Sequence, residues 1–160
     1  MTTLYIRDGE SFEKASSTLI LDRAQALISQ RFRVGAHVFN SPETMKQFLQ
    51  LKLAHLEYEV FCAIFLDSHH RLIEYVELFR GTVDSAQVYP REVIKAALAR
   101  NASAVIFAHC HPSGLCQPSN ADEVMTRRLR EALLLVDVRV LDHFIVAQSG
   151  TFSFADHGML

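Results

Sequence analysis

The spacing of apolar and polar positions divides the first part of the chain into two helices. From Ser11 to about Phe32, apolar residues recur at the spacing of one helical face among charged and polar ones, which predicts an amphipathic helix. A second helix is predicted from Ser41-Pro42-Glu43 to about Leu56. Serine is a preferred N-cap, proline fits the first helical position, and an acidic residue suits the first turn.

Two uninterrupted apolar runs predict strands that are buried on both faces. The first, residues 59–66, is followed by a turn-like segment, and residues 72–79 are expected to return beside it as a hairpin. The second run covers residues 103–108. The other predicted elements are a helix from Pro90 to Asn101, a helix that begins at Ser119 and carries an apolar stripe, and a final hairpin of residues 138–147 and 151–154.

Metal-ligand chemistry begins where the second buried strand ends. His109 and His111 are two residues apart, so in an extended segment both imidazoles project to the same side. Asp122 lies in the first turn of the helix that begins near Ser119, and the intervening loop can fold that turn over the histidines. Catalytic zinc sites keep three protein ligands and one open position for water. We therefore predict one mononuclear Zn²⁺ site with His109, His111 and Asp122 as ligands.

A hydrolytic zinc site also needs groups that move protons and stabilise charge. Glu59, at the start of the first buried strand, is the candidate general base and later general acid, although Glu57 and Glu77 lie near enough to compete. Ser119 is a candidate donor to the developing oxyanion. A plainer reading is also open, because a serine followed three residues later by an acid is a common helix cap.

Cysteine and a third histidine leave alternatives open. Thiolates bind zinc well, so Cys110 or Cys116 could complete a closed structural site. Cys110 lies between the histidines and should point to the opposite side of an extended segment, toward the core. His143, in a predicted strand, either has a structural role or donates a hydrogen bond that orients a neighbour.

Composition bounds the class of protein. The chain has 160 residues, 49% of them hydrophobic, which suits one ordinary globular domain. The apolar runs are too short for a membrane span, and the N-terminus lacks the apolar stretch of a signal peptide. The formal net charge of -2 lacks the basic footprint of a general nucleic-acid binder, and an odd set of 3 cysteines suggests no disulfide framework. We expect a soluble cytoplasmic protein.

The order of these residues carries a family resemblance. Glu59 followed by His109-Cys-His111-Pro and, six residues on, Ser119-Asn-Ala-Asp122 resembles the JAMM, or MPN-plus, metalloprotease signature. More narrowly, the chain resembles the RadC family over about residues 41–160. The segments that carry this likeness are Phe79-Arg-Gly-Thr82, Pro90-Arg-Glu92, Ala108-His-Cys-His-Pro-Ser-Gly114, Pro118-Ser119, Thr126 and Leu141-Asp-His143.

The resemblance implies an α/β fold of the JAMM/MPN type, with a central mixed sheet flanked by helices and a cytidine-deaminase-like architecture. It implies residues 1–40 as an N-terminal helical extension and 41–160 as the RadC-like domain, of the short, prophage-associated type without a helix-hairpin-helix module. It also implies zinc on His109, His111 and Asp122, with catalytic roles for Glu59 and Ser119.

The expected function is that of a zinc-dependent hydrolase, a metallopeptidase or isopeptidase that acts on a peptide or protein substrate. No membrane partner and no direct contact with nucleic acid are expected, and the sequence leaves the oligomeric state open. The alternative function is a non-enzymatic RadC-like module that acts in DNA repair or recombination through protein partners.

Overall fold

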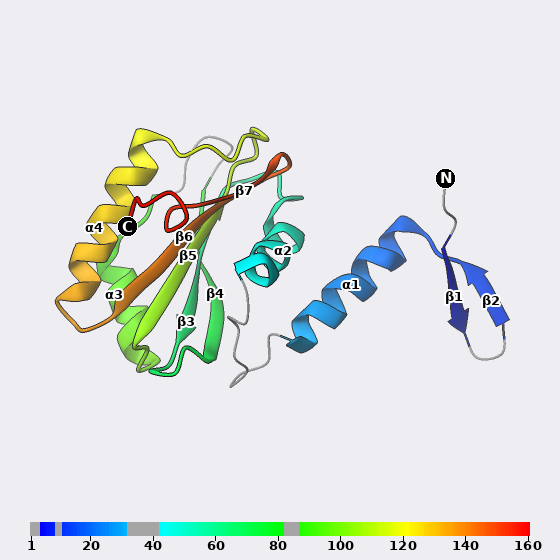
Figure 1. The fold of residues 1–160 in the computed structure, drawn as a ribbon, viewed down its shortest axis with the longest axis horizontal. Coiled ribbons are helices and arrows are strands. Elements are labelled where there is room, and N and C mark those ends of the chain that lie inside the picture. The colour runs from blue at the N-terminus through cyan, green and yellow to red at the C-terminus, as the bar shows by residue number, and fades with distance from the viewer. Residues whose placement is uncertain (1–3, 9–10, 32–41, 82–86) are drawn as a thin grey trace. The chain divides into compact units, whose positions relative to one another are not determined.

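The computed structural model describes residues 4–8, 11–31, 42–81 and 87–160 (Figure 1). The chain divides into two compact units, Met1–Phe32 and Arg33–Leu160. The predicted boundary between residues 40 and 41, together with the predicted N-cap at Ser41, lies outside the described residues. The candidate site residues all belong to the second unit.

The first unit is a hairpin followed by a helix. Strand β1 (Tyr5–Asp8) pairs antiparallel with β2 (Ser11–Lys14), and helix α1 spans Ser17–Arg31. The prediction of a helix from Ser11 was therefore wrong at its start, because residues 11–14 form ladder hydrogen bonds with β1 instead of helical ones. From Ser17 onward the predicted helix is confirmed.

The second unit is built on a five-stranded mixed sheet with the strand order β4-β3-β5-β6-β7 (Figure 1). Strands β5 and β6 are parallel, and the other neighbouring pairs are antiparallel. The predicted strands and both predicted hairpins are confirmed. The strands are β3 (Val60–Leu66), β4 (Leu72–Arg80), β5 (Ala104–Cys110), β6 (Arg139–Ala147) and β7 (Gly150–Ser153).

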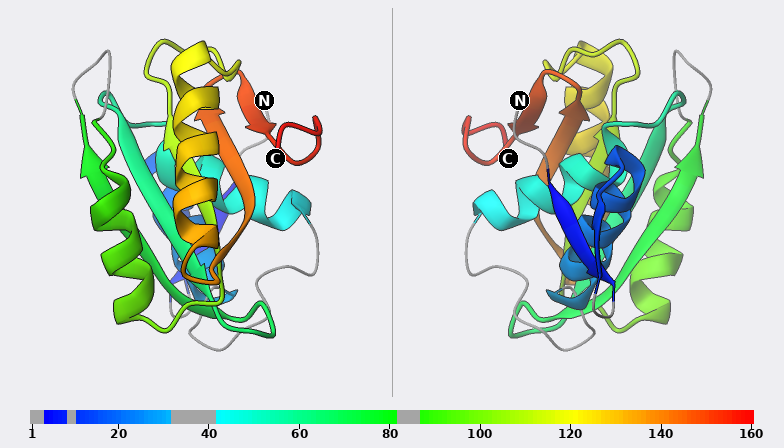
Figure 2. Two further views of the ribbon diagram at one scale, coloured as in Figure 1. Left: turned by 90° about the vertical axis from the view of Figure 1, so that its left-hand side faces the viewer. Right: turned by 90° about the vertical axis from the view of Figure 1, so that its right-hand side faces the viewer.

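Helices cover both faces of this sheet, which confirms the predicted α/β class (Figures 1 and 2). Helices α3 (Pro90–Ala99) and α4 (Asn120–Leu134) pack together on one face, and α2 (Pro42–Leu53) packs on the other. Each begins where its capping signal predicts, at Pro42, at Pro90 and directly after the N-cap Ser119. In the described part of the chain, no helix combines the length and the apolar character that crossing a membrane requires.

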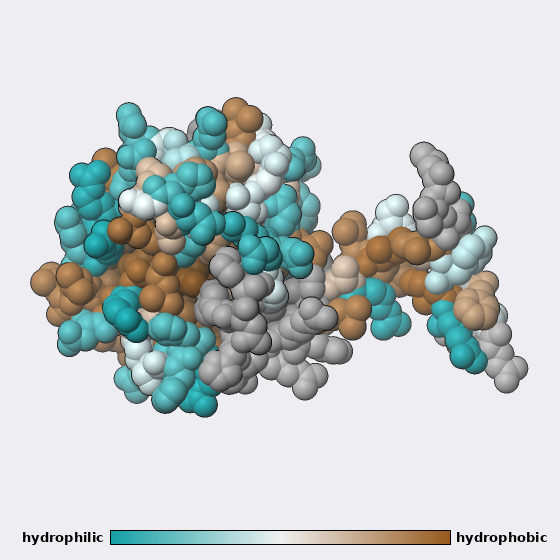
Figure 3. Space-filling view, in the orientation of Figure 1, coloured by the Kyte–Doolittle hydropathy of each residue, from teal (hydrophilic) through white to brown (hydrophobic). Residues whose placement is uncertain are grey.

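The central strands β3 and β5 are buried along their whole length, as their uninterrupted apolar runs predict. Side chains alternate between the two faces, so Phe61 and Phe107 belong to the core under α3 and α4. Leu129 and Leu133 of α4 close that core. Figure 3 shows that hydrophobic residues also reach the surface of this unit, in a patch bordered by hydrophilic ones. The candidate site residues His109 and His111 lie at the end of β5, directly after the core residue Phe107 and its neighbour Ala108.

Candidate metal centre

The two predicted histidines converge at the end of β5. His109 is the second-to-last residue of the strand, and His111 follows it directly. Their Nε2 atoms lie 2.9 Å apart, so the strand directs both rings to one side, as predicted. Because β3 runs antiparallel to β5 with Phe61 opposite His109, the residues that precede β3 lie next to the same site.

Glu59 is the acidic residue that this pairing brings to the histidines. Glu59, His109 and His111 form a group that could hold a metal ion, with ligand atoms that all lie within 4.8 Å of one another. Of the three glutamates that competed in the sequence, Glu57 and Glu77 are exposed, whereas Glu59 is half-buried and lines the cavity beside the histidines. The geometry thus favours Glu59 over both alternatives.

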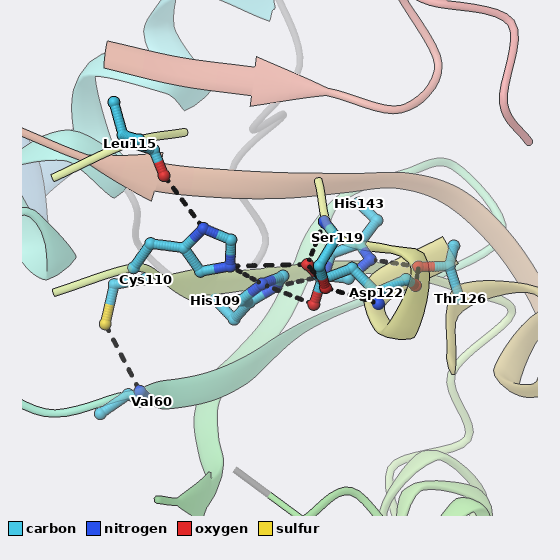
Figure 4. A network of polar contacts seen from close by, with 9 residues as sticks. Val60, His109, Cys110, Leu115, Ser119, Asp122, Thr126 and His143 are labelled. Atoms are coloured by element: carbon cyan, nitrogen blue, oxygen red, sulfur yellow. Dashed lines mark hydrogen bonds and ion pairs between the residues drawn. The ribbon is translucent and has the colours of Figure 1, made fainter. Parts of the chain in front are cut away.

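Asp122 reaches the same point from the first turn of α4. Its Oδ1 lies 3.1 Å from His109 Nε2, and its Oδ2 lies 3.5 Å from His111 Nε2. The loop after His111 thus folds the helix start over the strand end, as predicted (Figure 4). The side chain is buried, so the carboxylate faces the histidines instead of bulk water.

The same aspartate also caps its helix. The Asp122 amide donates to Ser119 Oγ at 3.2 Å, and the Ser119 amide donates to Asp122 Oδ2 at 2.8 Å, which is a reciprocal capping box. The Ser119 hydroxyl donates to that same oxygen at 2.6 Å. The plainer structural reading of this pair is therefore confirmed, and it coexists with a carboxylate that faces the histidines.

The charges in the site are coupled. Burial alone would raise the pKa of Asp122, but hydrogen bonds with His109 and His111 hold that pKa well below its usual range. The hydrogen bond with Asp122 in turn raises the pKa of His111. The carboxylate is thus held in its charged form, the form that binds a cation.

The donor set fits a divalent metal ion. His111 Nδ1 lies 3.0 Å from the carbonyl oxygen of Leu115, which can only accept, so Nδ1 carries a proton and Nε2 is the ring nitrogen that faces the site. Once the proton that Nε2 shares with Asp122 has left, Nε2 offers its lone pair to the site. That lone pair, the Asp122 carboxylate and the His109 ring crowd together, an arrangement that a cation stabilises. Imidazole nitrogen and carboxylate oxygen are ordinary ligands of zinc.

A cavity of about 740 Å³ opens onto this group. It is lined by Glu59, His109, His111 and Asp122, together with residues from the start of α3, the loop after His111 and the first turns of α4. The other lining residues include Val88, Pro90, Pro112, Val124, Met125 and Arg128. The cavity is large enough to hold a few residues of an extended peptide beside the polar group.

Cysteine does not belong to the candidate group. Cys110 lies between the histidines but points the other way, as predicted, and is 2% exposed. Its thiol donates to the Tyr58 carbonyl and accepts from the Val60 amide, each at 3.4 Å, and burial raises its pKa. Cys116 is partly exposed. The group of Glu59, His109 and His111 that the described residues form therefore contains no thiol.

His143 of β6 contacts His109, which makes it a neighbour of the site as well as a core residue. Its Nε2 lies 2.8 Å from His109 Nδ1, and its Nδ1 lies 2.6 Å from the hydroxyl oxygen of Thr126. The ring is completely buried, and burial, followed by the charge of His109, lowers its pKa well below the usual value. The sequence argument from ligand spacing missed Thr126, although its position four residues after Asp122 places both on one side of α4.

The register between β5 and β6 explains why His143 faces the site. Val105 is opposite Val140, but Ile106 is opposite Asp142, so Leu141 is an extra residue in β6. His143 is consequently opposite Phe107 and shares the face of His109. Without that one-residue shift, His143 would point to the face on which Cys110 lies.

Comparisons with known proteins identify the family of the chain. A family model described as a RadC-like JAB domain matches residues 39–159. A UPF0758 protein of Methylibium petroleiphilum is 51% identical over 148 residues, which cover 92% of this chain and 66% of the relative. A UPF0758 protein of Leptothrix cholodnii is 55% identical over 123 residues, 77% of this chain and 55% of the relative. A UPF0758 protein of Vibrio cholerae is 52% identical over 148 residues, 92% of each chain.

The aligned part of the chain thus spans a little over half to about two thirds of the first two relatives and nearly all of the third. The family match includes every residue of the candidate metal centre as well as Thr126 and His143. It also confirms the resemblance inferred from the sequence. The chain belongs to the RadC family and carries its RadC-like JAB domain.

Proposed function

We propose that the chain is a zinc-dependent hydrolase of peptide or isopeptide bonds, with His109, His111 and Asp122 as metal ligands. One observation carries the proposal. Two imidazole nitrogens and a buried carboxylate converge beside a second carboxylate, that of Glu59, and all four residues line one cavity. Membership in a JAB-domain family supports the same class of site.

The two carboxylates receive different roles because their surroundings differ. Asp122 is buried, fixed by the Ser119 capping box and turned toward both imidazoles, as a ligand must be. Glu59 precedes the strand and lines the cavity, where it can reach a water molecule and a substrate. When bound, zinc supplies a Lewis acid that makes water a nucleophile near neutral pH.

Glu59 acts as the base in this proposal. Its carboxylate takes a proton from the attacking water and passes it to the leaving amine, which is general acid–base work that one carboxylate can perform in sequence. Ser119 donates a hydrogen bond to the oxyanion of the scissile carbonyl. Because its hydroxyl donates to Asp122 in the structure, this role requires the hydroxyl to turn toward the substrate.

The first test of the proposal is the metal content. Wild-type protein purified without added metal is analysed for zinc, beside a Cys110→Ser/Cys116→Ser double variant. We expect zinc in both. Zinc that is lost with the cysteines would contradict the ligand set, and absence of zinc from both would favour the non-enzymatic, partner-binding alternative.

The second test separates metal binding from turnover. Zinc-loaded wild type and Glu59→Gln are screened against a peptide and isopeptide library, because glutamine keeps the size of the side chain but cannot take the proton. We expect cleavage by the wild type, a rate lower by about 100-fold or more in Glu59→Gln, and equal zinc content. Loss of zinc in Glu59→Gln would make Glu59 a ligand and overturn its role as base.

A further inference from the structure

A continuous line of buried polar contacts runs from α4 through β6 to the metal centre (Figure 4). Thr126 Oγ1 lies 2.6 Å from the backbone oxygen of Asp122 and 2.6 Å from His143 Nδ1. His143 Nε2 lies 2.8 Å from His109 Nδ1. Thr126, His143 and His109 are each at most 3% exposed, so water has little access to these contacts.

The proton in each contact can be assigned, starting from the carbonyl of Asp122. A carbonyl oxygen only accepts, so the 2.6 Å contact requires the single hydroxyl proton of Thr126. Thr126 Oγ1 must then accept from His143, which places the proton of His143 on Nδ1. If the Thr126 hydroxyl donated to His143 Nδ1 instead, Thr126 Oγ1 and the Asp122 carbonyl oxygen would lie 2.6 Å apart with no proton between them. Such a contact between two acceptors is repulsive.

The remaining contact assigns the proton of His109. His143 is fully buried and neither of its ring nitrogens is hydrogen-bonded to a carboxylate, which favours the neutral ring with one N–H. With that N–H on Nδ1, His143 Nε2 accepts, and His109 donates from its own Nδ1. His109 Nε2 then faces Asp122 and His111, and its lone pair is available to a metal ion once the proton that it shares with Asp122 has left.

We propose that Thr126 and His143 are positioning residues that hold His109 as its Nδ1–H tautomer, so that Nε2 is the atom offered to the metal. This inference rests on the proposed function, because holding the proton on His109 Nδ1 matters only if a metal ion binds Nε2. Ligand histidines commonly donate their second N–H to a carboxylate or carbonyl. Here neutral His143 accepts the N–H of His109, and Thr126 links His143 to the backbone carbonyl of Asp122. One turn of α4 thus supplies the proposed ligand Asp122 and, through Thr126, orients the proposed ligand His109.

A purely structural reading makes different predictions. Threonine in a helix often bonds to the carbonyl four residues earlier, and His143 packs against the rings of Phe61 and Phe154. If packing were the whole role, loss of the Thr126 hydroxyl would lower stability but leave the proton on His109 and the metal affinity unchanged. A test must therefore read the tautomer and the affinity directly.

The probe is zinc itself, added to metal-free full-length chain in which the histidine ring nitrogens carry ¹⁵N. Ring-nitrogen chemical shifts report which nitrogen bears the proton, and a competing chelator gives the zinc affinity. The variants are Thr126→Val, which keeps the shape but removes the hydroxyl, and Thr126→Ser as the matched control. Thermal unfolding of each variant monitors the fold.

In wild type we expect protons on Nδ1 of both His109 and His143 before zinc is added, and Nδ1–H retained on both after it binds. In Thr126→Val we expect His143 to shift its proton to Nε2 and zinc affinity to fall by about 10-fold or more, the range seen for lost outer-shell partners. Thr126→Ser should behave as wild type.

Two results would overturn the assignment: a bare Nδ1 on His109 in wild type, or a Thr126→Val variant with unchanged tautomers and affinity. Failure of the proposed function looks different, because wild type would then bind no zinc or bind it without turnover. The ring-nitrogen shifts of the metal-free wild type would still show whether His109 Nδ1 carries the proton, and so decide the role of Thr126 and His143. The same measurement decides that role if Thr126→Val does not fold.

Discussion

Two aspartates with lowered pKa values lie at opposite ends of the paired strands β3 and β5, and they differ in what surrounds them. Asp67 follows β3 in the turn to β4, where the amide of Arg71 above all, then its guanidinium and the His69 amide, lower its pKa to about 2. Asp122 is buried and faces imidazole rings that can exchange a proton for a metal ion.

The difference shows that a lowered pKa does not by itself mark a functional site. The Asp67 carboxylate accepts from the amides of His69 and Arg71 and from the Arg71 guanidinium, all within or next to its own turn, so that carboxylate closes a hairpin. The partners of Asp122 include two histidines whose nitrogens can bind a metal ion once their protons are absent. The chemistry of the partners, and the cavity beside them, separates the two roles.

The largest effect should come from Asp122→Asn, which removes the charge at the site while keeping the size of the side chain. We expect zinc affinity to fall by more than about 100-fold, beyond the cost of losing an outer-shell partner. Asp67→Asn is the matched control and should bind zinc as wild type does. Competition with a chelator measures the zinc affinity of wild type and of both variants. Equal losses of affinity in Asp122→Asn and Asp67→Asn would contradict the different roles assigned to the two aspartates.

The next effect concerns the cap that holds Asp122 in place. In Ser119→Ala the capping side chain is lost, which should cost about 1 kcal/mol of stability. The rate should fall by about 100-fold if the hydroxyl also donates to the oxyanion. Denaturant midpoints and kcat report the two effects separately. An unchanged rate at reduced stability would leave Ser119 as a helix cap alone.

A smaller effect, in stability only, should follow from Asp67→Asn. Because the folded-state pKa of Asp67 is lowered, its contribution is present above the unfolded value near 4 and is lost as pH falls through about 2. The variant should therefore be less stable than wild type at pH 7, with a difference that disappears toward pH 2. Thermal unfolding across that range measures it, and a pH-independent difference would contradict the assignment.

The smallest effect should be that of Cys110→Ser. Its thiol contacts the backbone of Tyr58 and Val60 on the face opposite the histidines, and a hydroxyl can make the same contacts. Zinc content should stay at the wild-type value. A loss of zinc in this variant would mean that strand alternation does not isolate Cys110 from the site.

The sequence predicted most of the fold of the second unit because its signals are local. Uninterrupted apolar runs identify the buried strands, and the prolines at 42 and 90 with the serine at 119 mark the helix starts. In the first unit the β1–β2 hairpin was missed, although the sequence Asp8-Gly9, which favours a hairpin turn, begins at the last residue of β1. A four-residue strand offers too few positions for a clear alternation.

The site was predictable only where it depends on local geometry. Alternation along β5 predicts that His109 and His111 share a side, and the helix start at Ser119 places Asp122 within reach. The contact of His143 with His109 depends on the register of a parallel pair, which is shifted at Leu141. The identity of neighbouring strands and a one-residue shift are tertiary features, and residue spacing along the chain does not determine them.

The most direct test of the metal centre is X-ray absorption at the zinc edge of the zinc-loaded wild-type protein. We expect a first shell of nitrogen and oxygen only, at about 2.0 to 2.2 Å, with outer scattering from two imidazole rings and no sulfur at about 2.3 Å. A sulfur shell, or outer scattering from fewer than two imidazoles, would contradict the centre formed by His109, His111 and Asp122.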